Sequence, residues 1–354
     1  MAPATIPGTA LRAATVWPPF GGLLKSNQRM DSSVAEMEIT VFDAPVLAPT
    51  PEKPFQPFSE AWLAGPVPAH LKGGTITSLT ALLTRLPEEE AAALVEFGSI
   101  WLDDRPCLDP SRPLAKHSSF RINPPAYGPV RFYEASSNRI VYEDDHLIIY
   151  NKESGRPSQG VPHDAHNNAL SGLTRLLAAR GERRGRLWLL HRLDADTSGL
   201  LMLAKDKEAA GIMGKAFQRG AVDKEYLCLG LGQRPEKKSF SVKNFIAKEG
   251  RRYVNRSKEP GLPAHTDFDF IMCSDTPALG GFHEALFRAK PRTGRTHQIR
   301  LHLAGKGWPI RGDRFYGRAE IEAAAPAPRL MLASARLAFA HPVTGEKIDV
   351  RLEK

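Results

Sequence analysis

The chain has few cysteines and no long apolar run among its 354 residues. Cys107, Cys228 and Cys273 are odd in number, widely separated and without the paired spacing of zinc ligands. This usage argues against a disulfide framework and is typical of a reducing cytoplasm, where we expect the protein to act. No segment approaches the roughly 18 apolar residues needed to cross a bilayer, so we expect no association with membranes.

Motifs for nucleotide and metal chemistry are also missing. The sequence has no Walker loop, no dinucleotide-binding glycine fingerprint and no zinc spacing. His163 and His166 in VPHDAH are spaced like weak metal ligands, but loop residues are the better interpretation. The sequence therefore gives no indication of metal or redox chemistry.

Positive charge is in excess, at +9 for the whole chain. Nine lysines or arginines and one acid lie between residues 288 and 318, which is a local charge of +8. A second basic cluster contains one acid, Glu182, and consists of Arg175, Arg180, Arg183, Arg184, Arg186 and Arg192. Such runs are usually solvated surface, but two of them favour a polyanionic partner, nucleic acid in particular.

Composition divides the chain into three parts. Residues 1–68 hold eleven of the 29 prolines and predict an extended or disordered cytoplasmic segment rather than a targeting sequence. Residues 69–126 predict two short helices, at SLTALLTRL and EEEAAALVEFG, followed by short strands in SIWLDDRPCLDP and SFRIN.

Residues 127–354 alternate short strands with helical stretches and form the third part. Strands are predicted on both sides of the acidic turn in RIVYEDDHLIIYNK and at KEYLCLG, AHTDFDFIM and FHEALFRAKP, with a helix in RTHQIRLHLAGKG. The absence of regular βα repeats indicates an α+β fold with a mixed, mainly antiparallel sheet and flanking helices.

The most informative stretch is LWLLHRLDADTSGLLMLAK, in which HRLDADTSG interrupts an apolar segment. It can be a polar loop whose threonine and serine cap the next element and whose Gly199 makes the turn. As an aspartic-protease fragment it fails, because a serine separates the Asp-Thr pair from glycine and no second copy supplies the other carboxylate.

The motif most closely resembles the signature of RluA-type pseudouridine synthases. His191 favours this type, because a related family acting on small-subunit rRNA usually has glycine there. The likeness continues in order through IVYEDDHLIIYNKESGRPSQG, DKEYLCLG, GRTHQIRLHLAGKGWPIRGDRFYG and LAFAHPVTGE, and covers about residues 138 to 354. Departures occur at Ala333, where histidine is usual, and at Asn151 and Glu153 around a lysine usually followed by proline.

The order of elements in residues 69–126 resembles the small alpha-L RNA-binding module that often precedes such domains. The segment is poor in the arginines that such modules use, so it resembles a degenerate copy. Ordinary packing of a helical hairpin is the alternative interpretation.

The resemblance implies an isomerisation of uridine to pseudouridine in rRNA or tRNA, without cofactor or metal. It identifies Asp194 as the essential carboxylate, acting as nucleophile or as base on the ribose, and Asp196 as a variable bystander. It implies that Arg300 keeps this acid ionised and that the ring of Tyr226 lies against the target uracil.

Further residues are expected to contact RNA or line the pocket. By resemblance Arg192 occupies the space of an extruded nucleotide and Ile299 packs beside the base, while His191 makes an orienting hydrogen bond. The remaining candidates for the pocket or for phosphates are Lys152, Lys224, Arg295 and His297. We expect a monomer with no obligate protein partner. The alternative from another class is a non-catalytic RNA-binding protein on the same fold.

Overall fold

A computed structural model describes residues 63–117, 119–123, 133–161, 165–182, 186–250, 252–277 and 279–352. The described chain forms two compact units. One contains residues 63–135 and 156–185, and the other contains residues 136–155 and 186–352. Among these residues, no helix has both the length and the apolar character of a membrane span.

The first unit contains the predicted pair of helices, α2 (Ile76–Thr84) and α3 (Glu88–Glu96). Thr75 caps α2 by accepting a hydrogen bond from the Ser78 N–H, while three glutamates fill the first turn of α3. A small antiparallel sheet in the order β1-β4-β2-β3 completes this part. Its strands are β1 (Leu63–Pro66), β2 (Ile100–Leu102), β3 (Arg105–Pro106) and β4 (Ser119–Ile122).

The segment predicted to be extended or disordered ran to residue 68. Its described end includes β1 (Leu63–Pro66), whose extended backbone pairs with β4. Residues 1–62 lie outside the described residues. The first unit also includes α4 (Ala169–Ala179), a helix that was not predicted, although its apolar residues recur on one face.

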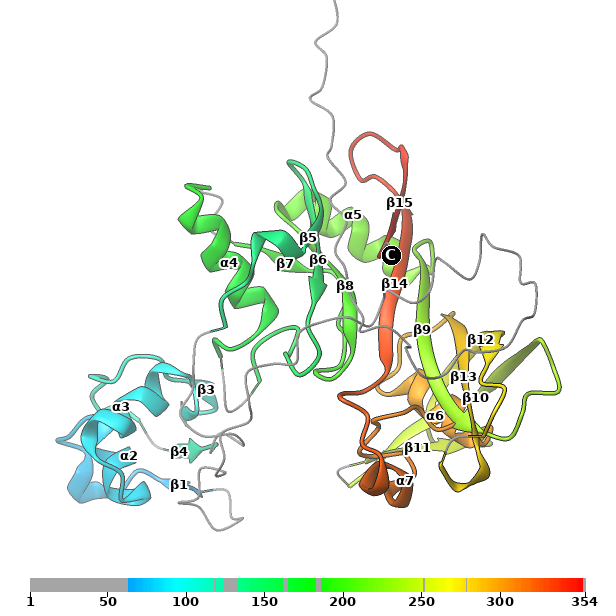
Figure 1. The fold of residues 1–354 in the computed structure, drawn as a ribbon. Coiled ribbons are helices and arrows are strands. Elements are labelled where there is room, and N and C mark those ends of the chain that lie inside the picture. The colour runs from blue at the N-terminus through cyan, green and yellow to red at the C-terminus, as the bar shows by residue number, and fades with distance from the viewer. Residues whose placement is uncertain are drawn as a thin grey trace, which may run out of the picture. The chain divides into compact units, whose positions relative to one another are not determined.

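The second unit is built on an eleven-stranded sheet in the order β11-β10-β12-β13-β9-β14-β8-β6-β5, with β15 beside β14 and β7 beside β8. Every pairing is antiparallel except β14 with β8. Figure 1 shows the long neighbouring strands β9, β13, β12 and β10. The strands are β5 (Ile140–Glu143), β6 (Leu147–Lys152), β7 (Trp188–Leu189), β8 (Ser198–Ala204), β9 (Asp223–Gly232), β10 (Ser239–Glu249), β11 (Arg252–Arg256), β12 (Leu262–Cys273), β13 (His283–Pro291), β14 (Leu332–Ala340) and β15 (Lys347–Arg351).

Strand β8 lies inside this sheet, between β14 and β6. All seven residues of SGLLMLA are buried, as expected for a strand covered on both faces. At Gly199 the backbone has φ +104°, and an added Cβ would lie 2.3 Å from the carbonyl oxygen of Ser334 on β14. Glycine is therefore required where the parallel pairing begins, because a side chain would push β14 away from the start of β8.

The second unit also contains helices. These are α5 (Lys207–Gln218), α6 (Gln298–Gly305) and α7 (Ala319–Ala324). Helix α5 contacts β8 and β7, whereas α6 contacts β11, β12 and β13 (Figure 1). The α+β architecture with a mainly antiparallel sheet and flanking helices is confirmed, although the hairpin of β10 and β11 and the helix α5 were not predicted.

Candidate active site

The carboxylate of Asp194 lies in the turn between β7 and β8. This turn is closed by a hydrogen bond from the Thr197 N–H to the Asp194 carbonyl, at 3.1 Å. Two side chains at the end of β6 support it: Lys152 Nζ donates to the Ala195 carbonyl at 3.0 Å, and Ser154 Oγ donates to the Asp196 carbonyl at 2.6 Å. The apolar flank after the motif thus becomes the buried strand β8, the flank before it contains the partly buried β7, and the polar centre is held as a rigid loop.

His191 and Lys152 are structural parts of this loop. The Met202 N–H donates to His191 Nε2 at 3.0 Å, and the imidazole stacks on Phe217. Burial lowers the pKa of His191 to about 3, so the ring is neutral and can accept. The Lys152 side chain is fully buried, and burial lowers its pKa to about 7. The predicted RNA contact of these two residues does not fit this placement, whereas the orienting hydrogen bond expected of His191 does.

Arg300 projects from α6 and joins two carboxylates. Its Nε and Nη2 donate to Asp313 at 2.7 Å each, and its Nη1 lies 3.5 Å from Asp194 Oδ2. The side chains of Arg300 and Asp313 are 3% and 0% exposed, compared with 28% for Asp194. The bidentate pair fixes the guanidinium in a single orientation and leaves one nitrogen for the partly exposed carboxylate. Asp313 was not predicted as a site residue.

A second side chain approaches the same oxygen. His297 Nε2 lies 3.9 Å from Asp194 Oδ2, and His297 Nδ1 is 2.8 Å from the Tyr316 hydroxyl. His297 caps α6 with φ +57°, an uncommon conformation for a residue other than glycine. Burial lowers the pKa of its ring, in opposition to the negative charge of Asp194. The structure therefore places His297 beside the catalytic candidate rather than only at the rim.

The start of α6 is held in place by Gln298, which sequence reasoning missed. Its amide accepts from Thr293 Oγ1 at 2.6 Å and the Arg295 N–H at 3.0 Å, and donates to the His265 carbonyl and Thr266 Oγ1 at 2.9 Å. A buried amide with all these partners fixes the helix relative to β12. Polar residues within the predicted helix were the available signal.

A pocket opens around Asp194. It contains side chains from the Asp194 loop, from β9, and from the segment that joins β13 to α6. Its lining residues are Arg192, Leu193, Asp194, Thr197, Lys224, Tyr226, Pro291, Thr293, Gly294, Arg295, His297, Gln298, Ile299, Arg300 and Leu332. All of the predicted site residues line it except His191 and Lys152, which lie behind the loop.

The floor of the pocket includes Tyr226 and Ile299, both buried. Burial raises the pKa of Tyr226 to about 12, so its hydroxyl keeps its proton at neutral pH. Lys224, two positions earlier on β9, also lines the pocket, and burial lowers the pKa of its amine. Arg192 is exposed at the rim, while Arg295 donates to the Pro263 carbonyl at 3.0 Å.

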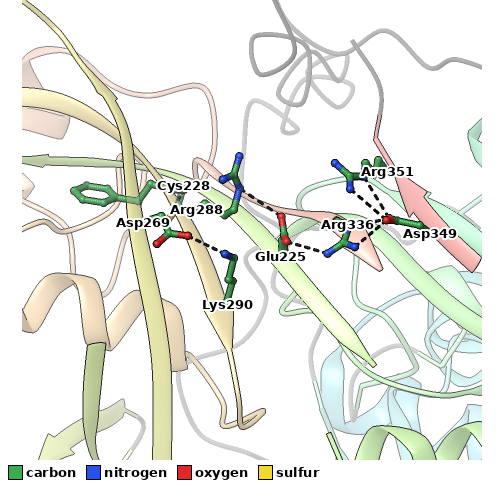
Figure 2. Close-up of polar contacts among 9 residues, drawn as sticks. Glu225, Cys228, Asp269, Arg288, Lys290, Arg336, Asp349 and Arg351 are labelled. Carbon is green, nitrogen blue, oxygen red and sulfur yellow. Dashed lines mark hydrogen bonds and ion pairs between the residues drawn. The ribbon is translucent and has the colours of Figure 1, made fainter. Parts of the chain in front are cut away.

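Less of the positive charge of segment 288–318 is available to a polyanion than its composition indicated. In the described part of the chain, five of the segment's nine basic residues form ion pairs, and each of the five pairs with at least one carboxylate from outside the segment. Figure 2 shows two of them, Arg288 with Glu225 and Lys290 with Asp269. Within the described part of the chain, no carboxylate lies within ion-pair distance of the other four, which are Arg295, Lys306, Arg314 and Arg318.

Figure 2 also shows that Glu225 connects β13 to β14 and β15. Its carboxylate pairs with Arg336 at 2.9 Å, and Arg336 forms two bonds of 2.8 Å to Asp349. Because neighbouring residues of a strand point to opposite faces, this network lies across the sheet from Tyr226. Much of the positive charge thus ties strands together, and a smaller part is available to a polyanion.

The described residues contain no cluster of three or more metal-ligating side chains. His163 lies outside these residues, and the ring of His166 packs edge-on against Phe97 at 6.4 Å. Cys228 is buried, and burial raises the pKa of its thiol.

Comparison with known proteins agrees with this fold. Residues 146–305 match the family described as RNA pseudouridylate synthase. Ribosomal large subunit pseudouridine synthase C of Escherichia coli strain K12 is 38% identical over 225 residues, which is 61% of this chain and 66% of that protein. The Salmonella typhi protein of the same name is 36% identical over 231 residues, which is 62% of this chain and 68% of that protein.

The solved structure of human RNA pseudouridylate synthase domain containing 1 is 25% identical, with a TM-score of 0.49, over 63% of this chain and 86% of the human chain. The mixed, mainly antiparallel sheet with its flanking helices is the pseudouridine synthase fold. By its family match and its similarity to these relatives, the chain belongs to the RluA-type pseudouridine synthases. It spans just under two thirds of the length of the Escherichia coli relative.

Proposed function

We propose that the protein isomerises uridine to pseudouridine in RNA, with Asp194 as the essential catalytic group. The observation that carries the proposal is the convergence of Asp194, Arg300 and Tyr226 on one pocket, in a chain that belongs to this family. The relatives are named for the large ribosomal subunit, which favours rRNA over tRNA as the substrate class. We further propose that the protein acts as a cytoplasmic monomer.

The chemistry needs one carboxylate beside a ribose and a nearby cation. The bond between uracil N1 and ribose C1′ breaks, the base turns, and a bond forms between C5 and C1′. The proton on C5 leaves to water and N1 gains one, so the reaction is balanced without an oxidant, a reductant or a second substrate. Asp194 acts at the ribose as nucleophile or as base, and the Arg300 guanidinium, 3.5 Å from its carboxylate, is the nearby cation.

Tyr226 and Ile299 form the surface against which the turning base packs. Both are buried at the pocket, so they offer apolar contact without competing for the carboxylate. The target nucleotide must leave its stack to reach them, at a cost of roughly a few kcal/mol. Arg192, exposed at the rim, is placed to fill the vacated position, because a guanidinium stacks and donates hydrogen bonds at the same time.

The test is release of tritium from RNA labelled at uracil C5, with rRNA and tRNA assayed separately. The wild-type protein should release tritium from rRNA, and Asp194→Asn should abolish the release. Asp196→Asn is the matched control, because it removes a carboxylate two positions away whose residue does not line the pocket. Tritium release by the Asp194→Asn variant would contradict the mechanism. If the wild-type protein releases no tritium from either rRNA or tRNA, the result supports a non-catalytic RNA-binding protein.

A further inference from the structure

The loop of residues 312–317, GDRFYG, supports both groups that face Asp194 Oδ2. Asp313 holds Arg300 through two bonds of 2.7 Å. The same carboxylate accepts the backbone N–H groups of Phe315 at 2.9 Å and Tyr316 at 3.1 Å. One buried side chain therefore fixes the guanidinium and also shapes the turn that presents Tyr316.

Tyr316 reaches His297 through its hydroxyl, at 2.8 Å from Nδ1. The two nitrogens of a neutral imidazole have opposite roles, so a proton donor at one of them places the N–H on the other. The backbone of Tyr253 lowers the pKa of the Tyr316 hydroxyl, against the larger rise that burial causes.

The protonation states support this direction. Burial raises the pKa of Tyr316, so its hydroxyl remains protonated at neutral pH. Burial lowers the pKa of His297, so the ring is neutral. The charged groups that act on this ring are Asp194, Arg300, Asp313 and Asp196.

Aromatic neighbours restrain the His297 ring. Its centroid lies 5.5 Å from that of Tyr253, 5.7 Å from Phe315 and 5.6 Å from Tyr316. Together with the φ of +57°, these contacts limit the rotation of the imidazole and keep Nε2 toward Asp194. No described residue contributes a hydrogen bond or ion pair to the other carboxylate oxygen, Oδ1.

We propose that Tyr316 is a positioning residue that donates to His297 Nδ1 and thereby places the His297 N–H on Nε2, where it joins Arg300 Nη1 at Asp194 Oδ2. This arrangement leaves Oδ1 as the oxygen that faces the nucleoside. The inference rests on the proposed function for its consequence in catalysis, whereas the tautomer of His297 can be read without any reaction.

The experiment combines histidine nitrogen NMR with single-turnover kinetics. In the ¹⁵N-labelled full-length protein, the His297 signals are assigned by their loss in His297→Gln. The wild-type ring should show a protonated Nε2, and Tyr316→Phe should shift it toward a mixture of tautomers. The rate at which the Tyr316→Phe variant converts saturating RNA should fall about tenfold, which is the effect of losing one hydrogen bond of about 1.4 kcal/mol. Its affinity for RNA should be unchanged.

Tyr253→Phe is the matched control, since it removes a hydroxyl from another ring on His297 and should leave both the tautomer and the rate at wild-type values. A double-variant cycle separates this role from general packing. In the His297→Gln background, Tyr316→Phe should have no further effect on the rate, because the ring that it orients is gone. Thermal unfolding of each variant confirms that the fold is kept.

Two results would overturn the proposal. One is a wild-type His297 protonated on Nδ1, and the other is a Tyr316→Phe rate equal to that of wild type. Absence of tritium release from the wild-type protein would instead reject the proposed function and leave the tautomer measurement intact.

Discussion

Arg300 lies 3.5 Å from Asp194 across 106 positions of the chain, with its guanidinium already held by a second carboxylate. The distance is longer than that of a charge-assisted hydrogen bond, whereas the bonds to Asp313 are short. The orientation of the Arg300 guanidinium is therefore fixed by Asp313 and does not depend on its contact with Asp194. This preorganisation means that the guanidinium need not reorient during the reaction.

Arg300→Met should destabilise the protein by about 3–5 kcal/mol, because it leaves Asp313 buried without a charged partner. Arg300→Met combined with Asp313→Asn should recover most of this loss and remain inactive. Urea denaturation measures the free energy of unfolding of the three proteins. Equal stability of the single and double variants would contradict the assignment of Asp313 as the main partner.

Lys152→Met should remove a pH dependence of stability above neutral pH. Burial lowers the pKa of Lys152 to about 7 from its ordinary 10.5, so between these values the unfolded chain binds more protons than the folded one. Stability from this group rises with pH in that window, by about 1 kcal/mol per pH unit. Denaturation at pH 7, 8 and 9 should show the wild type gaining stability relative to the variant. A constant difference would show that the ammonium is not desolvated.

Gly199→Ala should cost several kcal/mol, roughly 3 or more, because the new Cβ meets the Ser334 carbonyl and the backbone conformation is strained. Gly250→Ala provides the control. Its φ is +58°, but nothing lies within 4 Å of the added Cβ, so it should cost only about 1 kcal/mol. Comparable midpoints of thermal unfolding for the two variants would contradict the close approach of β14 to β8.

Arg192→Gln and Arg295→Gln should each weaken RNA binding and reduce the salt dependence of affinity by about one unit of slope. Arg288→Gln should leave both unchanged, because its guanidinium pairs with Glu225 across the sheet from Tyr226. Filter binding or fluorescence anisotropy at several salt concentrations measures the slopes. If Arg288→Gln had an equal effect, the paired residues of the basic segment would also contact RNA, which would contradict this assignment.

The residues that line the pocket were easier to predict from the sequence than the residues that hold them in place. Asp194, Tyr226 and Arg300 were identified because their motifs are local and resemble a family. Asp313 and Tyr316 were part of a matched motif, but their roles depend on side-chain contacts with α6, which spacing does not reveal. Lys152 was placed among possible phosphate ligands because sequence does not show burial. The positive charge that segment 288–318 offers to RNA was overestimated for the same reason, because the carboxylates that pair with it lie on distant strands.

The fold was predicted where the local signal was clear, as for the period-2 strands β12 and β13 and for α3, whose first turn holds three glutamates. The buried strand β8 was recognised only as an apolar flank of the motif, because complete burial removes the alternation that marks a strand. Its neighbours in the sheet are β6 and β14, and tertiary contacts determine this pairing. Register of this kind could not be derived from local pattern.

The most direct test of the central claim measures RNA binding and nucleoside conversion together in Asp194→Asn. One rRNA substrate is bound at saturating protein, its affinity is measured, and its nucleosides are then separated to quantify pseudouridine after a single turnover. The account predicts wild-type affinity with no pseudouridine formed, because the variant keeps the pocket and loses only the ionised carboxylate. Pseudouridine formed at the wild-type rate by Asp194→Asn would contradict it.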